Sequence, residues 1–327
     1  MKTVRRPMYN EEQKNAFIQE AVVSESTRKS AVNVMTAIAP FEEKAGRDIA
    51  LWESEDLLSV LESVCGLRTR SKYSKLAIIT NYRKWCAAKG FEGAKGDTPD
   101  LSDLNTDKIK TMLVRSPAHL QQCLDIVFDP ESDETQDNVY RCFFWLAYGG
   151  MDEATIHKLT SKDVNFEYME AKYGSEVAIL YRHSLQAVRN CVRLKSFLYR
   201  NESYTNKKEI RRDRVPGEEL LRGVRGTPSM MNFRMQLSRK LAEKRTDKEQ
   251  TAPLTYTRVW LSGVFYRIYE AEQAGIAPDF HAIAMDSPGG KKVLAGESKA
   301  DPKTALQAIA KDFRTDYNRW KLVVSTI

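Results

Sequence analysis

Paired cysteines and clustered histidines, the usual ligands of structural zinc, are absent from this sequence. None of the cysteines has CxxC spacing, and the four histidines are equally dispersed. Each cysteine lies in a helix-like segment beside apolar residues, which predicts buried thiols in a reducing compartment. The five are Cys65, Cys86, Cys123, Cys142 and Cys191. We therefore expect neither a metal site nor a cofactor.

Long hydrophobic runs are also missing. No apolar run approaches the roughly 18 residues that a membrane-spanning helix needs. The N-terminus, MKTVRRPMYNEEQ, is basic, but acids and amides follow it instead of the apolar segment of a secretory signal. These absences predict a cytoplasmic protein with no membrane partner.

What the sequence does contain is ample core material and an excess of positive charge. The 327 residues are 42% hydrophobic and 29% charged, which is typical of a globular protein with room for two domains. Lysine and arginine number 51 against 44 acidic residues, a formal net charge of +7. This balance fits a nucleic-acid partner without requiring one.

Hydrophobic spacing divides the chain into two parts. Residues 1–93 show apolar residues at three- and four-residue intervals in four segments, which predicts four helices and no strand. Asn10 is a candidate N-cap of the first, and Pro40 should bend or end the second. The stretch EGAKGDTPDLSDLNTD is typical of a linker. We predict a helical DNA-binding domain at 1–93, a linker at 94–107 and a second domain at 108–327.

The second part is also mainly helical. Ser116 and Pro117 open one helix, and a long buried helix is expected from about 135 to 148. The β-branched and aromatic residues on both sides of Gly174 predict a hairpin, the only clear strand signal in the chain. The remaining helices are expected around 184–199, 229–244, 255–273 and 303–322. The predicted fold class is therefore mainly α, with one small antiparallel sheet in the second domain.

Two basic clusters are candidate phosphate contacts. Segment RTRSKYSK lies at the start of the fourth helix, where free backbone N–H groups and the helix dipole favour an anion; it supplies Arg68, Arg70, Lys72 and Lys75. Segment NKKEIRRDR, in a polar stretch, supplies Lys207, Lys208, Arg211, Arg212 and Arg214. Each cluster alone is more often a solvated surface, but one in each domain favours a clamp on a long anion such as double-stranded DNA.

The segment that follows the buried helix resembles the first motif of a large enzyme family. GGMDEATIHKLTSKDV can be aligned with the pattern T-G-L-R-x-x-E-x-x-x-L-x-x-x-D-V of the tyrosine recombinase (phage integrase) superfamily. The match keeps Gly150, Met151, Leu159 and the Asp163–Val164 pair, whereas Thr155 replaces the usual glutamate. The resemblance implies a SAM-like N-terminal core-binding domain and an integrase-like catalytic domain that close around duplex DNA.

The same resemblance places the family's active-site positions, and most have changed. Asp152 takes the position of the first catalytic arginine, and Thr255 stands for the histidine of the HxxR box, with Arg258 as its retained arginine. Lys172 in the hairpin is the candidate lysine, and Tyr317 in RTDYNRWK is the candidate nucleophile. An anion in place of a buried cation removes several kcal/mol of transition-state stabilisation from phosphate chemistry, so the set implies a protein that does not cut DNA.

Three of these positions also have a plain structural interpretation. Asp152 could cap the helix that follows it, and Arg258 could pair with a helix-end carboxylate or contact a phosphate. Tyr317 could simply pack the last helix with Trp320.

Domain lengths, the segment FEEKAGRDI and the ending DYNRWK resemble a particular group within the superfamily, the phage lytic-cycle repressors of the MrpR type. That resemblance implies a sequence-specific, DNA-associated phage or prophage transcriptional repressor without recombinase activity, able to self-associate on DNA. Two alternatives stay open at this point. One is an active site-specific recombinase that uses Tyr317, and the other is a helical interaction scaffold with no DNA partner.

Overall fold

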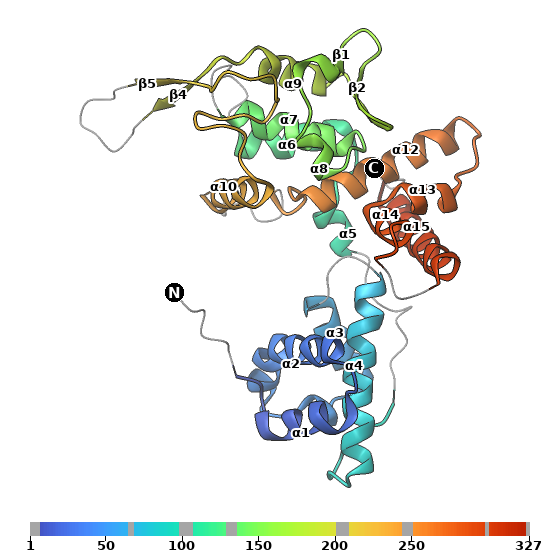
Figure 1. Ribbon diagram of the computed structural model, residues 1–327. Coiled ribbons are helices and arrows are strands. Elements are labelled where there is room, and N and C mark those ends of the chain that lie inside the picture. Colours follow the sequence, from blue (N-terminus) through green and yellow to red (C-terminus); the bar gives the residue numbers. More distant parts are fainter. Residues whose placement is uncertain are drawn as a thin grey trace. The chain divides into compact units, whose positions relative to one another are not determined.

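The chain divides into two compact units, Met1–Thr106 and Asp107–Ile327. The computed structural model describes residues 7–64, 69–97, 107–128, 136–200, 209–243, 251–297 and 301–324 (Figure 1). Each unit has its own hydrophobic core, and the two cores share no residue.

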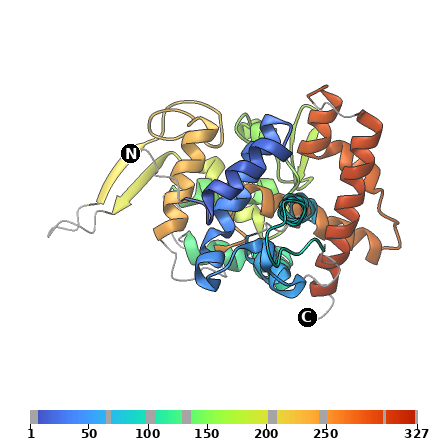
Figure 2. The same cartoon turned by 90° about the horizontal axis from the view of Figure 1, so that it is seen from below.

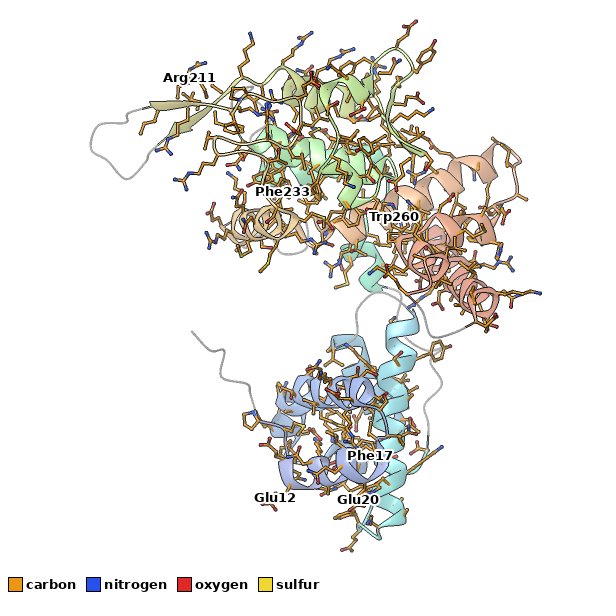
Figure 3. All side chains as sticks on the ribbon, viewed as in Figure 1. Glu12, Phe17, Glu20, Arg211, Phe233 and Trp260 are labelled. Carbon is orange, nitrogen blue, oxygen red and sulfur yellow. The ribbon has the colours of Figure 1, made fainter. Side chains whose placement is uncertain are left out.

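Helices build the first unit around one aromatic cluster. The described elements are α1 (Glu11–Ala21), α2 (Glu25–Ala45), the 3-10 turn η1 (Ile49–Leu51), α3 (Ser54–Val64) and α4 (Thr69–Ala88), which confirms the four predicted helices. Phe17 of α1 packs on α4, with ring centroids 5.3 Å from Tyr82 and 6.0 Å from Trp85. Figure 3 shows Phe17 directed into the unit, whereas Glu12 and Glu20 on the same helix point outward. The amphipathic spacing of α1 therefore explains how it attaches to α4.

Two local predictions for this unit hold only in part. Asn10 is the N-cap residue of α1, as predicted, but its side chain does not cap the helix and instead donates to Asp48 Oδ2 at 3.1 Å. Helix α2 does not end at Pro40 but continues to Ala45 and ends at Gly46, in the left-handed conformation with φ 64°. Burial of apolar residues just before the proline, Ile38 and Ala39, helps to offset its missing hydrogen bond.

The second unit is organised around α7 (Asp137–Tyr148), in which every residue is buried. The other described helical elements are α5 (Asp107–Met112), α6 (Pro117–Val127), α8 (Glu153–Ile156), η3 (Ser161–Asp163), α9 (Ser184–Arg193), α10 (Met230–Glu243), α12 (Tyr256–Gln273), α13 (Phe280–Asp286), α14 (Pro288–Leu294) and α15 (Pro302–Val324). Helices α9 and α12 pack against α7. A Cβ at Gly263 of α12 would lie 1.9 Å from the carbonyl oxygen of Tyr148, so glycine is what lets α12 approach the end of α7.

The predicted hairpin is confirmed, but it is not the only one. Strands β1 (Val164–Asn165), β2 (Glu170–Tyr173) and β3 (Glu176–Ile179) form an antiparallel sheet, with Gly174 at φ 61° in the turn between β2 and β3. A second antiparallel pair joins β4 (Ser196–Arg200) to β5 (Glu209–Asp213). The prediction of a helix reaching 199 and of one sheet was therefore wrong. The sequence of β5, EIRRD, is charged enough to resemble a solvated loop, which hid its pairing with β4.

The last helices close the core of the second unit. In both views α13, α14 and α15 lie side by side (Figures 1 and 2). Trp320 of α15 is buried and donates its indole N–H to the carbonyl of Val114 at 3.1 Å. The thiols of the four described cysteines are free and buried, as predicted, whereas Cys65 lies outside the described residues. The fold class, mainly helical with small antiparallel sheets, is confirmed, and no described helix is long and apolar enough to cross a membrane.

Candidate nucleic-acid interface

The Gly149–Asp152 turn is fixed by close packing on both sides. A Cβ at Gly149 would lie 2.6 Å from the carbonyl oxygen of Ile179, and Gly150 adopts a φ of 111°, so both positions require glycine. Trp260 of α12 donates its indole N–H to the Gly150 carbonyl at 3.1 Å. Asp152 is the last residue of this rigid turn.

Asp152 is the N-cap of α8. Its carboxylate accepts from the backbone N–H of Ala154 at 2.9 Å, and its own backbone N–H donates to Glu176 Oε2 at 3.0 Å. The capping interpretation is therefore confirmed: the Asp152 carboxylate satisfies a helix end.

Further acids surround this carboxylate, and the nearby cations are already paired. The guanidinium of Arg234 binds Glu153 through two nitrogens, and Lys291 binds Glu176. Burial, together with the charge of Asp152, raises the pKa of Tyr256, whose hydroxyl donates to a backbone carbonyl of the turn. A phosphate placed here would meet the negative charge of the Asp152 carboxylate.

The hairpin lysine and the α12 positions have other roles. Lys172 is exposed on β2, paired across the sheet with Val177. Thr255 is the N-cap of α12 and accepts from the backbone N–H of Arg258 at 3.4 Å. The Arg258 guanidinium donates to the carbonyl of Ala252, and burial lowers the pKa of Arg258. Arg258 thus fastens the segment that leads into its own helix.

Tyr317 is fully buried at 0% exposure, packed against other aromatic rings of α12, α13 and α15. Its hydroxyl donates to Glu272 Oε2 at 2.5 Å, and the same oxygen accepts from Lys321 at 2.6 Å. Burial, the hydrogen bond and the charge of Glu272 raise the pKa of Tyr317, which opposes formation of a nucleophilic phenolate.

The structure brings Asp152 and Arg258 to the same end of α12 but holds the Tyr317 hydroxyl apart from them. Glu272, which holds the Tyr317 hydroxyl, follows Arg258 by 14 residues on the same helix, about 21 Å along its axis. Asp152 lies beside the first turn of α12, where Tyr256 contacts the preceding carbonyl of Met151. Tyr317 is thus held toward the end of α12 that lies away from Asp152 and Arg258.

The first predicted basic cluster is described only in part. Arg68 lies outside the described residues, and so does the side chain of Arg70. Lys72 is 5% exposed, and the Lys75 ammonium donates to the carbonyl of Val64 at 2.5 Å. A phosphate contact by Lys72 would require this side chain to leave its buried position.

The second predicted cluster contains two kinds of arginine. Lys207 and Lys208 lie outside the described residues, whereas Arg211 and Arg212 are exposed on β5. Figure 3 shows Arg211 at the hairpin of β4 and β5. Arg214, in contrast, is 6% exposed and its guanidinium donates to four backbone carbonyls, those of Cys191, Leu194, Leu220 and Arg222. It holds the loop after β5 against the end of α9.

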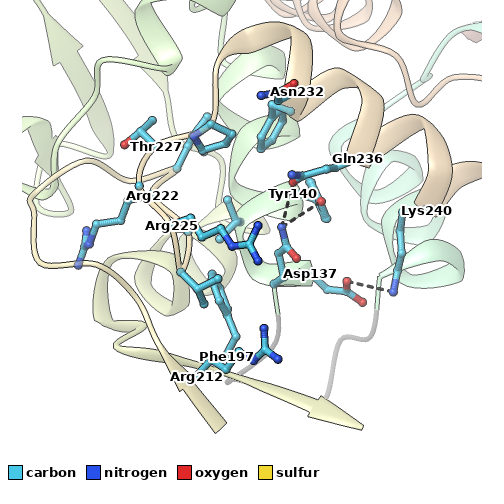
Figure 4. Close-up of a pocket in the computed structure, with 18 of the residues that line it drawn as sticks. Asp137, Tyr140, Phe197, Arg212, Arg222, Arg225, Thr227, Asn232, Gln236 and Lys240 are labelled. Atoms are coloured by element: carbon cyan, nitrogen blue, oxygen red, sulfur yellow. Dashed lines mark hydrogen bonds and ion pairs between the residues drawn. The ribbon is translucent and has the colours of Figure 1, made fainter. Parts of the chain in front are cut away.

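A basic cavity of about 1000 Å³ lies between the β4–β5 hairpin, the loop 221–229 and α10 (Figure 4). The cationic side chains that line it are Arg212, Arg222, Arg225, Arg239 and Lys240. Two acids also line it, and one of them, Asp137, pairs with Lys240 at 3.2 Å. The sequence did not reveal this site because its cations come from three separate segments and form no run. Arg212 is the residue that the prediction and the cavity share.

The cations of the cavity differ in how they are held. Arg222 donates to the carbonyls of Val215 and Glu219 and belongs to the loop's own framework. Arg239 is exposed on α10 and Arg225 on the loop. Within the described residues, no group hydrogen-bonds to these two side chains. Their guanidinium groups are the ones best able to meet an incoming anion.

Known proteins resemble this chain in two comparisons, one of structure and one of sequence. The crystal structure of XerA recombinase aligns with 94% of this chain and 99% of its own, at 13% sequence identity and a TM-score of 0.32. No curated protein matches the sequence. Residues 8–88 match the family model described as MrpR, N-terminal core-binding domain, so the resemblance to MrpR-type proteins is confirmed in the first unit.

Proposed function

We propose that this protein is a sequence-specific, double-stranded DNA-binding protein that represses phage or prophage transcription and does not cut DNA. The observation that carries the DNA-binding part is the match of residues 8–88 to the MrpR core-binding domain. The basic cavity in the second unit supports it, because two exposed guanidinium groups there have no partner among the described residues.

The arrangement around Asp152 supports binding without cleavage. Phosphodiester cleavage by a tyrosine needs cations on the phosphate and a hydroxyl that can reach it. Here the arginine position is a capping carboxylate, and the Tyr317 hydroxyl is committed to Glu272 at 2.5 Å. A protein that holds a promoter without breaking it would occlude the polymerase and act as a repressor.

The experiment measures binding and covalent chemistry on the same DNA. The full-length protein is titrated against a pool of random-sequence duplexes over a salt series, and log K should fall linearly with log salt because phosphate contacts release counterions. The same duplexes carrying a nick, which traps a tyrosyl–DNA adduct, should yield no covalent species. Tyr317→Phe should bind as the unchanged protein does.

Three outcomes separate the candidates. Salt-dependent binding with no adduct is the expected result. A Tyr317-dependent adduct would make the protein an active recombinase and overturn the non-cutting proposal. Absence of binding even at low salt would favour the interaction scaffold. Duplexes that the protein retains at high salt are then selected from the pool, and repression is checked by a reporter whose promoter carries the selected duplex.

A further inference from the structure

Helix α10 is attached to the second unit by only a small part of its surface. Its buried residues are Phe233 and Leu237, four positions apart, so a narrow stripe attaches it to the core. Arg234 fastens one further side by its ion pair with Glu153. The remaining sides of the helix are exposed or face the basic cavity.

One side of α10 carries a stripe of base-reading residue types. Asn232, Gln236 and Arg239 are spaced by four and three residues, so they lie along one side of the helix, and all three line the cavity. Asparagine and glutamine amides match the hydrogen-bonding edge of adenine in the major groove, and an arginine fork matches that of guanine. Their present contacts are slight, since Gln236 accepts from Gln136 at 3.4 Å.

The opposite wall of the cavity supplies charge. Figure 4 shows Arg225 on the loop and Arg212 on β5, facing α10 across the opening. With Arg222, Arg239 and Lys240 there are five cations against two carboxylates, Asp137 and Glu243, a net charge of +3. A wall of arginines opposite an amide-bearing helix fits one strand of a duplex, with its phosphates toward the loop and its base edges toward the helix.

We propose that α10 enters the major groove of duplex DNA and reads base edges through Asn232, Gln236 and Arg239, while Arg225 and Arg212 hold the adjacent phosphates. This inference rests on the proposed DNA-binding function and adds to it the residues that confer sequence specificity. Met231 provides a matched control, because it is 71% exposed on the same helix and does not line the cavity.

The test selects bound duplexes from a random-sequence pool with the full-length protein and with Asn232→Ala, Gln236→Ala and Arg239→Ala. Each stripe variant should lose preference at its own position of the selected site and bind the selected duplex about 5- to 150-fold more weakly. Asn232→Ala and Gln236→Ala should leave affinity for random duplex unchanged. Arg225→Ala should weaken selected and random duplex alike and reduce the salt slope by about 0.9, the value of one phosphate contact.

The possible failures are distinguishable. If the unchanged protein binds no duplex, the proposed function fails first. If it selects a site and the three stripe variants select the same site with unchanged discrimination, α10 does not read bases and this inference is overturned. The same holds if Met231→Ala relaxes specificity as the stripe variants do. Circular dichroism of each variant confirms that the exposed substitutions leave the fold intact.

Discussion

At the scale of single residues, two neighbouring arginines of one basic run have different roles. Arg212 and Arg214 are two positions apart in RRDR, and charge alone treats them alike. Strand geometry exposes Arg212 beside the cavity, whereas Arg214 lies just past the strand with its guanidinium on four backbone carbonyls. A buried arginine that satisfies carbonyls is part of the framework, so the two should respond oppositely to substitution.

Arg214→Met should destabilise the second unit by about 3 kcal/mol or more, because several carbonyls lose their donor at once. Arg212→Met should change stability by less than about 1 kcal/mol and should instead weaken duplex binding. Urea denaturation of both variants measures the first effect, and fluorescence anisotropy with a labelled duplex measures the second. Equal loss of stability in the two variants would contradict the assignment of separate roles.

At the scale of elements, helices with a clear apolar stripe were predictable. The segments that form α7 and α12 show regular apolar spacing. Ser116 was recognisable as the N-cap of α6, and its hydroxyl accepts from the backbone N–H of His119 at 3.1 Å. Helices α13 and α14 were missed because the Ser-Pro-Gly-Gly sequence that caps and begins α14 is typical of a loop. Ser287 ends the first of these helices and caps the second, so two short helices share one residue.

The candidate site was less accessible to prediction than the fold. The turn at Asp152 could be located because its glycines and cap are contiguous in sequence. Arg225 and Arg239 belong to no charge run, and only the folding of the loop 221–229 against α10 brings them to one cavity. Strand β5 was not predicted for a related reason. It is defined by main-chain pairing with β4, and its charged side chains do not indicate that pairing.

The contact between α12 and α7 gives a prediction at this scale. Gly263→Ala should destabilise the second unit by several kcal/mol, since its Cβ would lie 1.9 Å from a backbone oxygen that cannot move without shifting α7. Gly289→Ala in α14 is the matched control, because its nearest neighbour would be 3.7 Å away and alanine favours helix by up to about 1 kcal/mol. Thermal unfolding compares them, and equal Tm values for both variants would refute the close-packing argument.

At the scale of the whole molecule, the chain has two cores that share no residue. Phe17 and its ring partners close one core, and α7 anchors the other. Separate cores favour separate cooperative transitions, since neither set of buried contacts depends on the other. DNA bound by both units would then couple them, because a ligand that binds the native form stabilises each part that it contacts.

Leu61→Ala and Leu124→Ala make this coupling measurable. Both leucines are fully buried, one in each core, and each truncation should cost about 2 to 5 kcal/mol. In calorimetry without DNA we expect two transitions, with Leu61→Ala lowering the Tm of one and Leu124→Ala that of the other. A saturating concentration of the selected duplex should raise the Tm of both transitions at low salt. It should raise neither Tm at high salt, where phosphate contacts are lost. A single transition lowered by both substitutions would contradict independent units, and a duplex that raises one transition alone would confine the DNA contact to that unit.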